Sequence, residues 1–189
     1  MKLKNIAWLL IIALCSIFAA CKKVKEPPTE LSKLPPATQT GANTFGCLVN
    51  GKAWVAQRND CSIFCSPSFK IYYDGSNGGY LGIEALIIDI KNNIDERFDI
   101  VFDSSNLKLI HPIRISNPLT TSSFKNFIGV SNCSKYEHYS DSSVIHIGNV
   151  IMTRYDLPNG IFSGTFEFTL TKPGCETLNV TDGRFDKIL

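Results

Sequence analysis

The sequence predicts an all-β domain, either an antiparallel β-sandwich or a partly closed β-barrel of about eight to ten strands. Several runs alternate apolar and polar residues with a period of two, which is typical of half-buried strands. Dipeptides typical of tight turns separate these runs at short intervals. Beyond the first 20 residues no long window shows helical periodicity. Together these observations exclude a helical or α/β domain.

The first element is a leader at residues 1–20. It begins with basic residues, Lys2 and Lys4, continues with an apolar run over residues 6–20, and ends in two alanines before Cys21. This order is typical of a bacterial lipoprotein signal peptide, whose cleavage leaves the cysteine as the lipid-carrying N-terminus. We therefore expect Cys21 to carry two or three acyl chains, since one chain holds a protein on a bilayer only marginally.

Two alternatives apply to the leader. It is also consistent with an ordinary signal peptide cut near Ala20, because Phe18 stands where lipoprotein signals usually have leucine. A short membrane anchor is the other alternative, although the apolar run is below the ~20 residues that a spanning helix needs. The lipoprotein interpretation places the protein in the cell envelope, lipid-anchored on the outer membrane.

The second element, residues 21–44, is a linker with two Pro-Pro pairs and no aromatic residue. Such a composition predicts a disordered, extended tether, which would reach roughly 70 Å at ~3.1 Å per residue. The composition changes at Phe45, and residues 45–189 are enough for one domain. Loss of residues 1–20 removes two lysines and no acid, which leaves 17 basic and 17 acidic side chains. A formally neutral chain does not favour nucleic-acid binding.

The alternation of apolar and polar residues predicts the strands of the domain. Phe98, Ile100 and Phe102 alternate with polar residues, and residues 162–170 do the same. Residues 81–90 and 144–155 carry apolar residues on both parities, so they are central strands or contain a bulge near Gly148-Asn149. The expected turns are Asn50-Gly51, Asp74 to Gly79, Asn92-Asn93, Pro158-Asn159-Gly160 and Asp182-Gly183. The Asp74 run has part of a calcium-loop rhythm, but Ala85 stands where a bidentate glutamate is needed, so we interpret it as a hairpin loop.

The domain has five cysteines, Cys47, Cys61, Cys65, Cys133 and Cys175. Since an exported chain meets oxidising conditions, we expect disulfides and one unpaired thiol. We favour Cys47 with Cys175, and Cys133 with Cys61 or Cys65. A zinc site built from Cys61, Cys65, Cys133 and His138 is the less favoured alternative, because thiolates in an oxidising compartment more often pair. No cofactor is predicted.

The sequence contains no Gly-x-Ser-x-Gly elbow and no His-Glu-x-x-His motif. His146 alternates with Ile145 and Ile147, which predicts a histidine on the wet face of a strand. An envelope hydrolase or isomerase with an unrecognised site remains the alternative to a non-catalytic binding or structural module.

Tyrosines are the best candidates for binding residues. Tyr72 and Tyr73 point to opposite faces of one strand, so one of them is expected outside. Tyr136 and Tyr139 lie in a polar stretch that we expect to be a loop, and Asp74 begins the predicted hairpin loop. We predict that Tyr136, Tyr139 and Asp74 bind an envelope glycan, a peptide or a partner protein. The alternative, which is the commoner arrangement, is that the tyrosines pack at the rims of the sheets with their hydroxyls in water.

Three stretches, residues 43–54, 163–168 and 181–186, read NTFGCLVNGKAW, SGTFEF and TDGRFD. As a set they resemble a family of uncharacterised lipoproteins from Bacteroidota-type bacteria. The resemblance runs from the first to the last predicted strand, and it implies a lipid-anchored, all-β envelope domain. It transfers no catalytic residue.

Overall fold

The structure, a computed structural model, describes residues 27–60, 66–74, 79–103, 115–126, 132–137 and 141–189. Within these ranges the chain is all-β, as predicted, with two short 3-10 helices, η1 (Leu31–Lys33) and η3 (Asn132–Ser134). No helix in the described part is long and apolar enough to cross a membrane. The strands are β1 (Thr44–Val49), β2 (Lys52–Val55), β3 (Gln57–Arg58), β4 (Phe69–Asp74), β5 (Tyr80–Asp89), β6 (Ile94–Asp103), β7 (Ile115–Asn126), β8 (Lys135–Glu137), β9 (Ile145–Asp156), β10 (Ile161–Thr171) and β11 (Leu178–Ile188).

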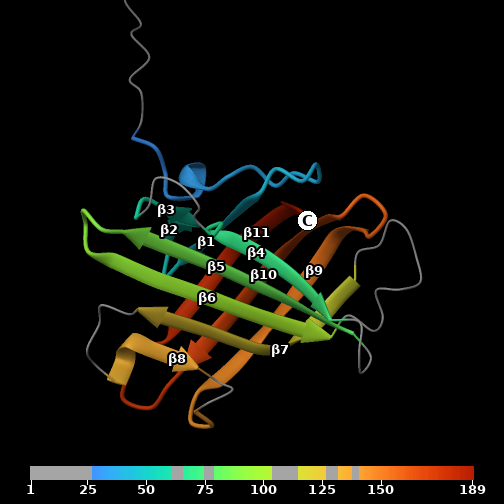
Figure 1. The fold of residues 1–189 in the computed structure, drawn as a ribbon. Helices are drawn as coiled ribbons and strands as arrows, with labels where there is room; N and C mark the ends of the chain where they lie inside the picture. The colour runs from blue at the N-terminus through green and yellow to red at the C-terminus, as the bar shows by residue number, and fades with distance from the viewer. Residues whose placement is uncertain (1–26, 61–65, 75–78, 104–114, 127–131, 138–140) are drawn as a thin grey trace, which may run out of the picture.

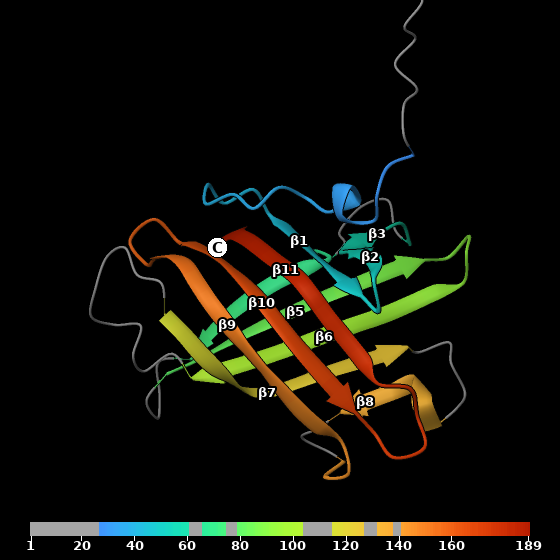
Figure 2. The same ribbon diagram turned by 180° about the vertical axis from the view of Figure 1, so that it is seen from behind.

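The strands form two sheets that pack as a sandwich and do not close into a barrel (Figures 1 and 2). One sheet has the order β2-β1-β11-β10-β9, and the other contains β6, β5 and β3, with β4 also on β5 and β8 on β7. Strand β7 joins the sheets, because Ile115 to Pro118 pair with β9 whereas its later residues pair with β6. A register shift in β7 opposite Val101 and Phe102 accompanies this change of partner.

The predicted alternation is confirmed in both sheets. Phe98, Ile100 and Phe102 of β6 are buried, as are Phe166, Phe168 and Leu170 of β10. The two sheets pack against each other through aromatic rings: Trp54 of β2 meets Phe98 of β6 edge-on with ring centroids 4.7 Å apart, and Phe98 also meets Phe168 of β10 edge-on at 5.9 Å. This contact between faces fixes how the sheets pack.

Three predicted turns are confirmed by their backbone. Asn50 and Gly51 join β1 to β2 with φ of 46° and 78°, Asn93 turns between β5 and β6 with φ of 55°, and Gly160 turns between β9 and β10 with φ of 66°. The hairpin predicted at Asp74 to Gly79 is also confirmed, since Asp74 pairs with Tyr80 across β4 and β5. Residues 75–78 lie outside the described part.

One local prediction is wrong. Asp182-Gly183 is a bulge within β11 and not a turn: Asp182 has φ of 52°, and both ladders of β11 shift register beside it. Of the two alternatives for residues 144–155, the central strand is confirmed, because β9 lies between β10 and β7 and Asn149 pairs with Glu167 in regular register. The bulge between β9 and β10 lies instead opposite Ser163 and Gly164.

Part of the predicted linker is docked on the domain. Residues 30–43, which we call the strap, run along one end of the sandwich in Figures 1 and 2. Glu30 accepts a hydrogen bond from the backbone N–H of Ala53 at 2.8 Å, so it caps the free edge of β2. Leu34 is buried, and the carbonyl of Pro35 accepts from Arg184 at 3.3 Å.

The strap is held most firmly by the buried carboxylate of Asp186 on β11. This carboxylate accepts hydrogen bonds from the Thr38 hydroxyl at 2.6 Å and from the backbone N–H groups of residues 40, 41 and 42 at 2.9, 2.8 and 3.1 Å. Ser163 donates a further bond at 2.6 Å. The expectation of an extended tether up to residue 44 is therefore not met from Glu30 onward.

Candidate functional site

Tyr136 is not an exposed binding residue, which corrects the prediction. It lies on β8 opposite Phe124, is only 5% exposed, and donates its hydroxyl to the carbonyl of Glu176 at 2.5 Å. Burial and the nearby Glu176 carboxylate raise the pKa of its phenol. Tyr139 lies outside the described residues, and Asp74 is the last residue of β4. The two described residues lie on different strands, Tyr136 on β8 and Asp74 on β4, and the burial of Tyr136 removes it from any surface site.

The cysteine pairing also differs from the prediction. Cys133 is bonded to Cys175 with an S–S distance of 2.04 Å, whereas Cys47 is a free thiol in the core, where burial raises its pKa. The favoured Cys47–Cys175 bond is wrong because Cys47 points inward from β1. Cys21, Cys61 and Cys65 lie outside the described residues.

The alternative zinc site loses one of its four ligands, because the sulfur of Cys133 is used in the disulfide. Within the described ranges no three His, Cys, Asp or Glu side chains are grouped closely enough to hold a metal ion. His146 lies half-buried opposite the buried Leu170, whereas Ile145 and Ile147 are the exposed residues, so its predicted face is wrong.

One exposed tyrosine was expected on β4, and this is confirmed. Tyr72 is 51% exposed on the outer face of β4, and its ring lies directly on Gly82 of β5, where any Cβ would come within 2.0 Å of the ring. Tyr80 is exposed near it. Partial burial, with the Asp99 and Glu84 carboxylates, raises the pKa of Tyr72.

A shallow hollow of about 410 Å³ lies on the outer face of β9, β10 and β11. Its lining mixes polar side chains, namely Asn149, Glu167, Asp182 and Arg184, with the apolar Ala37 and Ile151. Several of these groups are already engaged: Asn149 donates to Glu167 at 3.3 Å, and Arg184 donates to the strap carbonyl of Pro35. The hollow is open, and we do not assign it a ligand.

A second, more apolar pocket lies beside β2 and β3, the two strands at the ends of the strand order. The order of strands runs from β2 at one end to β3 at the other, and these two strands do not pair. Residues of β2 and β3, together with residues of β1, β5, β6 and β7, line a pocket of about 360 Å³. Its walls are mostly apolar, with Val49, Trp54, Ile87, Ile94 and Phe124, and Lys52, Gln57 and Glu96 are its polar members.

Glu96 and Trp54 give this pocket its chemistry. The indole N–H of Trp54 donates to the Glu96 carboxylate at 2.9 Å. Burial raises the pKa of Glu96, and the bond from Trp54 only partly opposes that effect. A half-buried carboxyl at the edge of an apolar, aromatic pocket is the usual arrangement of a small-ligand site, in which few polar groups orient a mainly apolar occupant.

The sequence contains a pattern that indicates the burial of Glu96. Glu96 is in phase with Phe98, Ile100 and Phe102, so the alternation that identified the strand also places this acid on its core-facing side. A charged residue at an apolar position of such a pattern is costly to bury, and it marks a special site. The pocket around Glu96 was not foreseeable, because its walls come from the β1–β2 hairpin and from β3, β5, β6 and β7, which are distant in sequence.

Comparisons of this chain with models of known protein families, with curated proteins and with solved structures gave no match.

Proposed function

We propose that this chain is a lipid-anchored protein of the outer membrane whose β-sandwich is a non-catalytic binding module. The observation that carries the proposal is the apolar pocket between β2 and β3 with the Glu96 carboxyl inside it. The leader, with Cys21 after two alanines, supports the location. The resemblance to Bacteroidota-type lipoproteins supports the same location.

The lining defines the occupant. The aliphatic and aromatic walls of the pocket favour an apolar group, and the volume suits one large side chain or a small molecule. Glu96 favours a hydrogen-bond donor or an ammonium group on that occupant, because an ionised carboxylate only accepts. We therefore propose that the pocket receives an aromatic or aliphatic group with an attached amine from a peptide or protein partner in the envelope.

The same lining favours binding over catalysis. Among the described residues the pocket has one carboxyl and no histidine, serine or cysteine. Acid–base hydrolysis uses paired groups of different pKa, and nucleophilic catalysis uses a nucleophile beside a base. An envelope enzyme is the alternative that the following experiment separates.

The first prediction concerns the pocket. Tryptamine, which has an aromatic body and an ammonium group, should bind weakly in ligand-observed NMR, whereas indoleacetate, which has a carboxylate, should not. Binding of tryptamine should weaken as the pH falls through the raised pKa of Glu96, because the neutral carboxyl no longer attracts the ammonium. Glu96→Gln should abolish the preference for the amine, and Glu167→Gln, a change on the outer face, should leave it intact.

Generic esterase, glycosidase and peptidase substrates are tested beside these ligands. Turnover that depends on Glu96 would support the enzyme and reject the binding module. Equal binding of tryptamine to the wild type and to Glu96→Gln would contradict the proposal that the pocket around Glu96 is the binding site. The anchor is tested separately: Cys21→Ser should abolish metabolic fatty-acid labelling and membrane retention.

A further inference from the structure

The strap shortens the free part of the tether. In the described part of the chain, which begins at residue 27, the first side chain that bonds the domain is Glu30, which accepts from Ala53 of β2. If the lipid is on Cys21, only residues 22–29 separate the anchor from the sandwich. Nine Cα–Cα steps span at most roughly 30 Å when fully extended, less than half of the distance that a free linker up to residue 44 would allow. The domain must therefore stay close to the bilayer.

The strap also determines which end of the sandwich is near the anchor. In Figures 1 and 2 the blue N-terminal segment, the β9–β10 turn and the C-terminus all lie at the same end. Ile188 lies against the strap, since a Cβ on Gly41 would be 2.8 Å from its Cβ. The backbone N–H of Leu189 donates to the carbonyl of Gly160 in the β9–β10 turn at 2.9 Å. Strap, turn and C-terminus thus form one continuous surface.

This end carries exposed apolar side chains. Leu157 in the β9–β10 turn is 46% exposed, Ile188 and Leu189 are 42% and 61% exposed, and Leu31 on η1 is 48% exposed. Exposed apolar groups that gather at one surface indicate an interaction site. We call Leu31, Leu157, Ile188 and Leu189 the apolar end.

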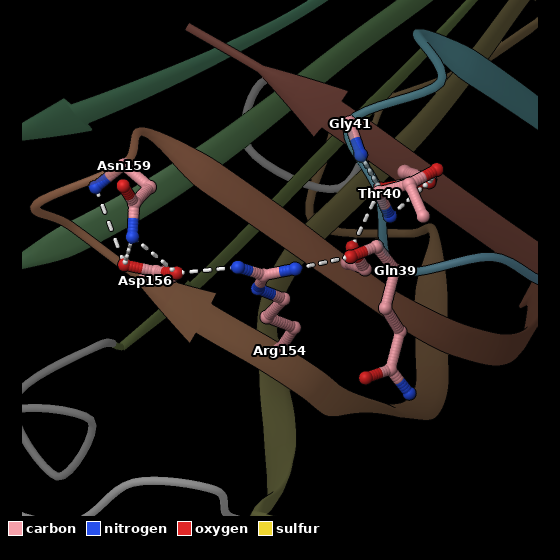
Figure 3. Close-up of polar contacts among 8 residues, drawn as sticks. Gln39, Thr40, Gly41, Arg154, Asp156 and Asn159 are labelled. Carbon is pink, nitrogen blue, oxygen red and sulfur yellow. Dashed lines mark hydrogen bonds and ion pairs between the residues drawn. The ribbon is translucent and has the colours of Figure 1, made fainter.

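Hydrogen bonds and an ion pair link the strap to β9 and to the β9–β10 turn at the apolar end, as Figure 3 shows. Arg154 donates to the strap carbonyl of Gln39 and to the Asp156 carboxylate, each at 2.6 Å. Asp156 also accepts from the backbone N–H of Asn159 at 3.2 Å, which closes the turn around Leu157. The bonds from Arg154 and Asn159 lower the pKa of Asp156 to about 2. Glu30 is likewise paired with Lys33, so the acids beside the apolar side chains are neutralised.

We infer that the apolar end rests on the lipid bilayer in the anchored protein. This inference rests on the lipid anchor of the proposed function. The short free segment holds this end within reach of the headgroups, and its sequence contains Lys22, Lys23 and Lys25, which attract anionic lipid. Apolar side chains flanked by basic residues are the pattern of proteins that lie on a membrane surface.

The experiment uses tryptophan as a depth reporter in the full lipidated protein. The mature chain has one tryptophan, the buried Trp54, because Trp8 belongs to the leader. The lipidated variants Leu157→Trp and Leu189→Trp are reconstituted into vesicles of phosphatidylethanolamine and phosphatidylglycerol that contain brominated phosphatidylcholine. The matched control is Ile147→Trp, because Ile147 is 74% exposed and lies near the other end of β9.

We expect the brominated lipid to cause a loss of emission in Leu157→Trp and Leu189→Trp but not in Ile147→Trp or the wild type. Two reporters are used so that the result does not depend on one variant folding, and thermal melts confirm that each is native. Vesicle-bound protein with no quenching at the apolar end, or with equal quenching at Ile147→Trp, would overturn this inference alone. Absence of lipid on Cys21, shown by mass spectrometry, would overturn the anchor and this inference with it.

Discussion

At the scale of single residues, Asp186 shows how one buried acid can organise a segment that is distant in sequence. Burial by itself would raise the pKa of this carboxyl, but hydrogen bonds from Ser163, Thr38 and the backbone of the strap outweigh it and hold the pKa well below its ordinary value. Such charge-assisted bonds form only with the ionised carboxylate. Ionised Asp186 therefore stabilises both the folded domain and the docked strap.

The second prediction follows from this carboxylate. Asp186→Asn should lower the free energy of unfolding by about 3 kcal/mol at neutral pH, because a neutral amide cannot satisfy all the donors directed at it. Since the folded pKa is depressed, this contribution is present above the unfolded pKa of ~3.9 and is lost as the pH falls toward the folded value. Urea melts between neutral and acidic pH should show the two proteins converging at low pH.

Asp182→Asn is the matched control, because it removes an exposed acid from the same strand. Asparagine tolerates the positive φ of 52° at that position, so its stability should equal that of the wild type. A loss of stability for Asp186→Asn that is unchanged down to the most acidic pH would contradict the role given to the ionised carboxylate.

At the scale of elements, the disulfide joins two connections that are distant in sequence. Cys133 belongs to η3, Cys175 lies between β10 and β11, and 42 residues separate them. Lys172 reinforces the same contact by donating to the carbonyls of Asn132 and Lys135 at 2.9 and 3.1 Å. This contact holds the short strand β8, and with it Tyr136, against the rest of the sandwich.

The third prediction is that replacing Cys133 and Cys175 together with alanine lowers the free energy of unfolding by roughly 3–4 kcal/mol, the value expected for a closed loop of this length. Reductant should lower the melting temperature of the wild type to that of the double variant. Cys47 should resist alkylation until the protein unfolds, because its thiol is buried and its pKa is raised. Rapid alkylation of Cys47 in the native protein would show that this part of the core is wrongly placed.

At the scale of the whole molecule, the strap belongs to the domain although its composition is that of a linker. Without it, the buried Asp186 loses five described donor groups, which belong to Thr38, Thr40, Gly41 and Ala42, and the edge of β2 loses the cap from Glu30. A buried carboxylate that has lost its hydrogen-bond donors lowers the free energy of unfolding several times more than the loss of one surface contact does.

The fourth prediction compares chains that begin at different residues. A chain that begins at Glu30 should melt at nearly the same temperature as one that begins at Lys22, because the described residues of this segment, 27–29, are exposed and Thr29 bonds only to Ser32 of the strap among the contacts described. A chain that begins at Phe45 should be less stable by several kcal/mol, since it leaves Asp186 buried with few donors. Equal melting temperatures of all three chains would show that the strap is not part of the folded unit.

The sequence by itself determined the class of the fold and the local geometry of most turns. Alternation at Phe98, Ile100 and Phe102 depends only on the two-residue period of a strand, and Asn50-Gly51 forms a turn because of its own backbone preferences. Asp182-Gly183 has the same local chemistry, yet it lies inside β11, because pairing with β1 and β10 on both sides turned the positive φ into a bulge.

Only the tertiary structure decided the features that join distant parts of the chain. The partner of Cys175, the burial of Tyr136, the docking of the strap on Asp186 and the pocket around Glu96 all depend on which segments meet after the sheets pack. The strap has the composition of a free linker. Its own residues do not indicate that it binds the Asp186 carboxylate, which lies more than 140 residues away in the sequence. The alternation of a strand and the backbone of a turn depend on residues that are adjacent in sequence, whereas these contacts form only when the two sheets have packed.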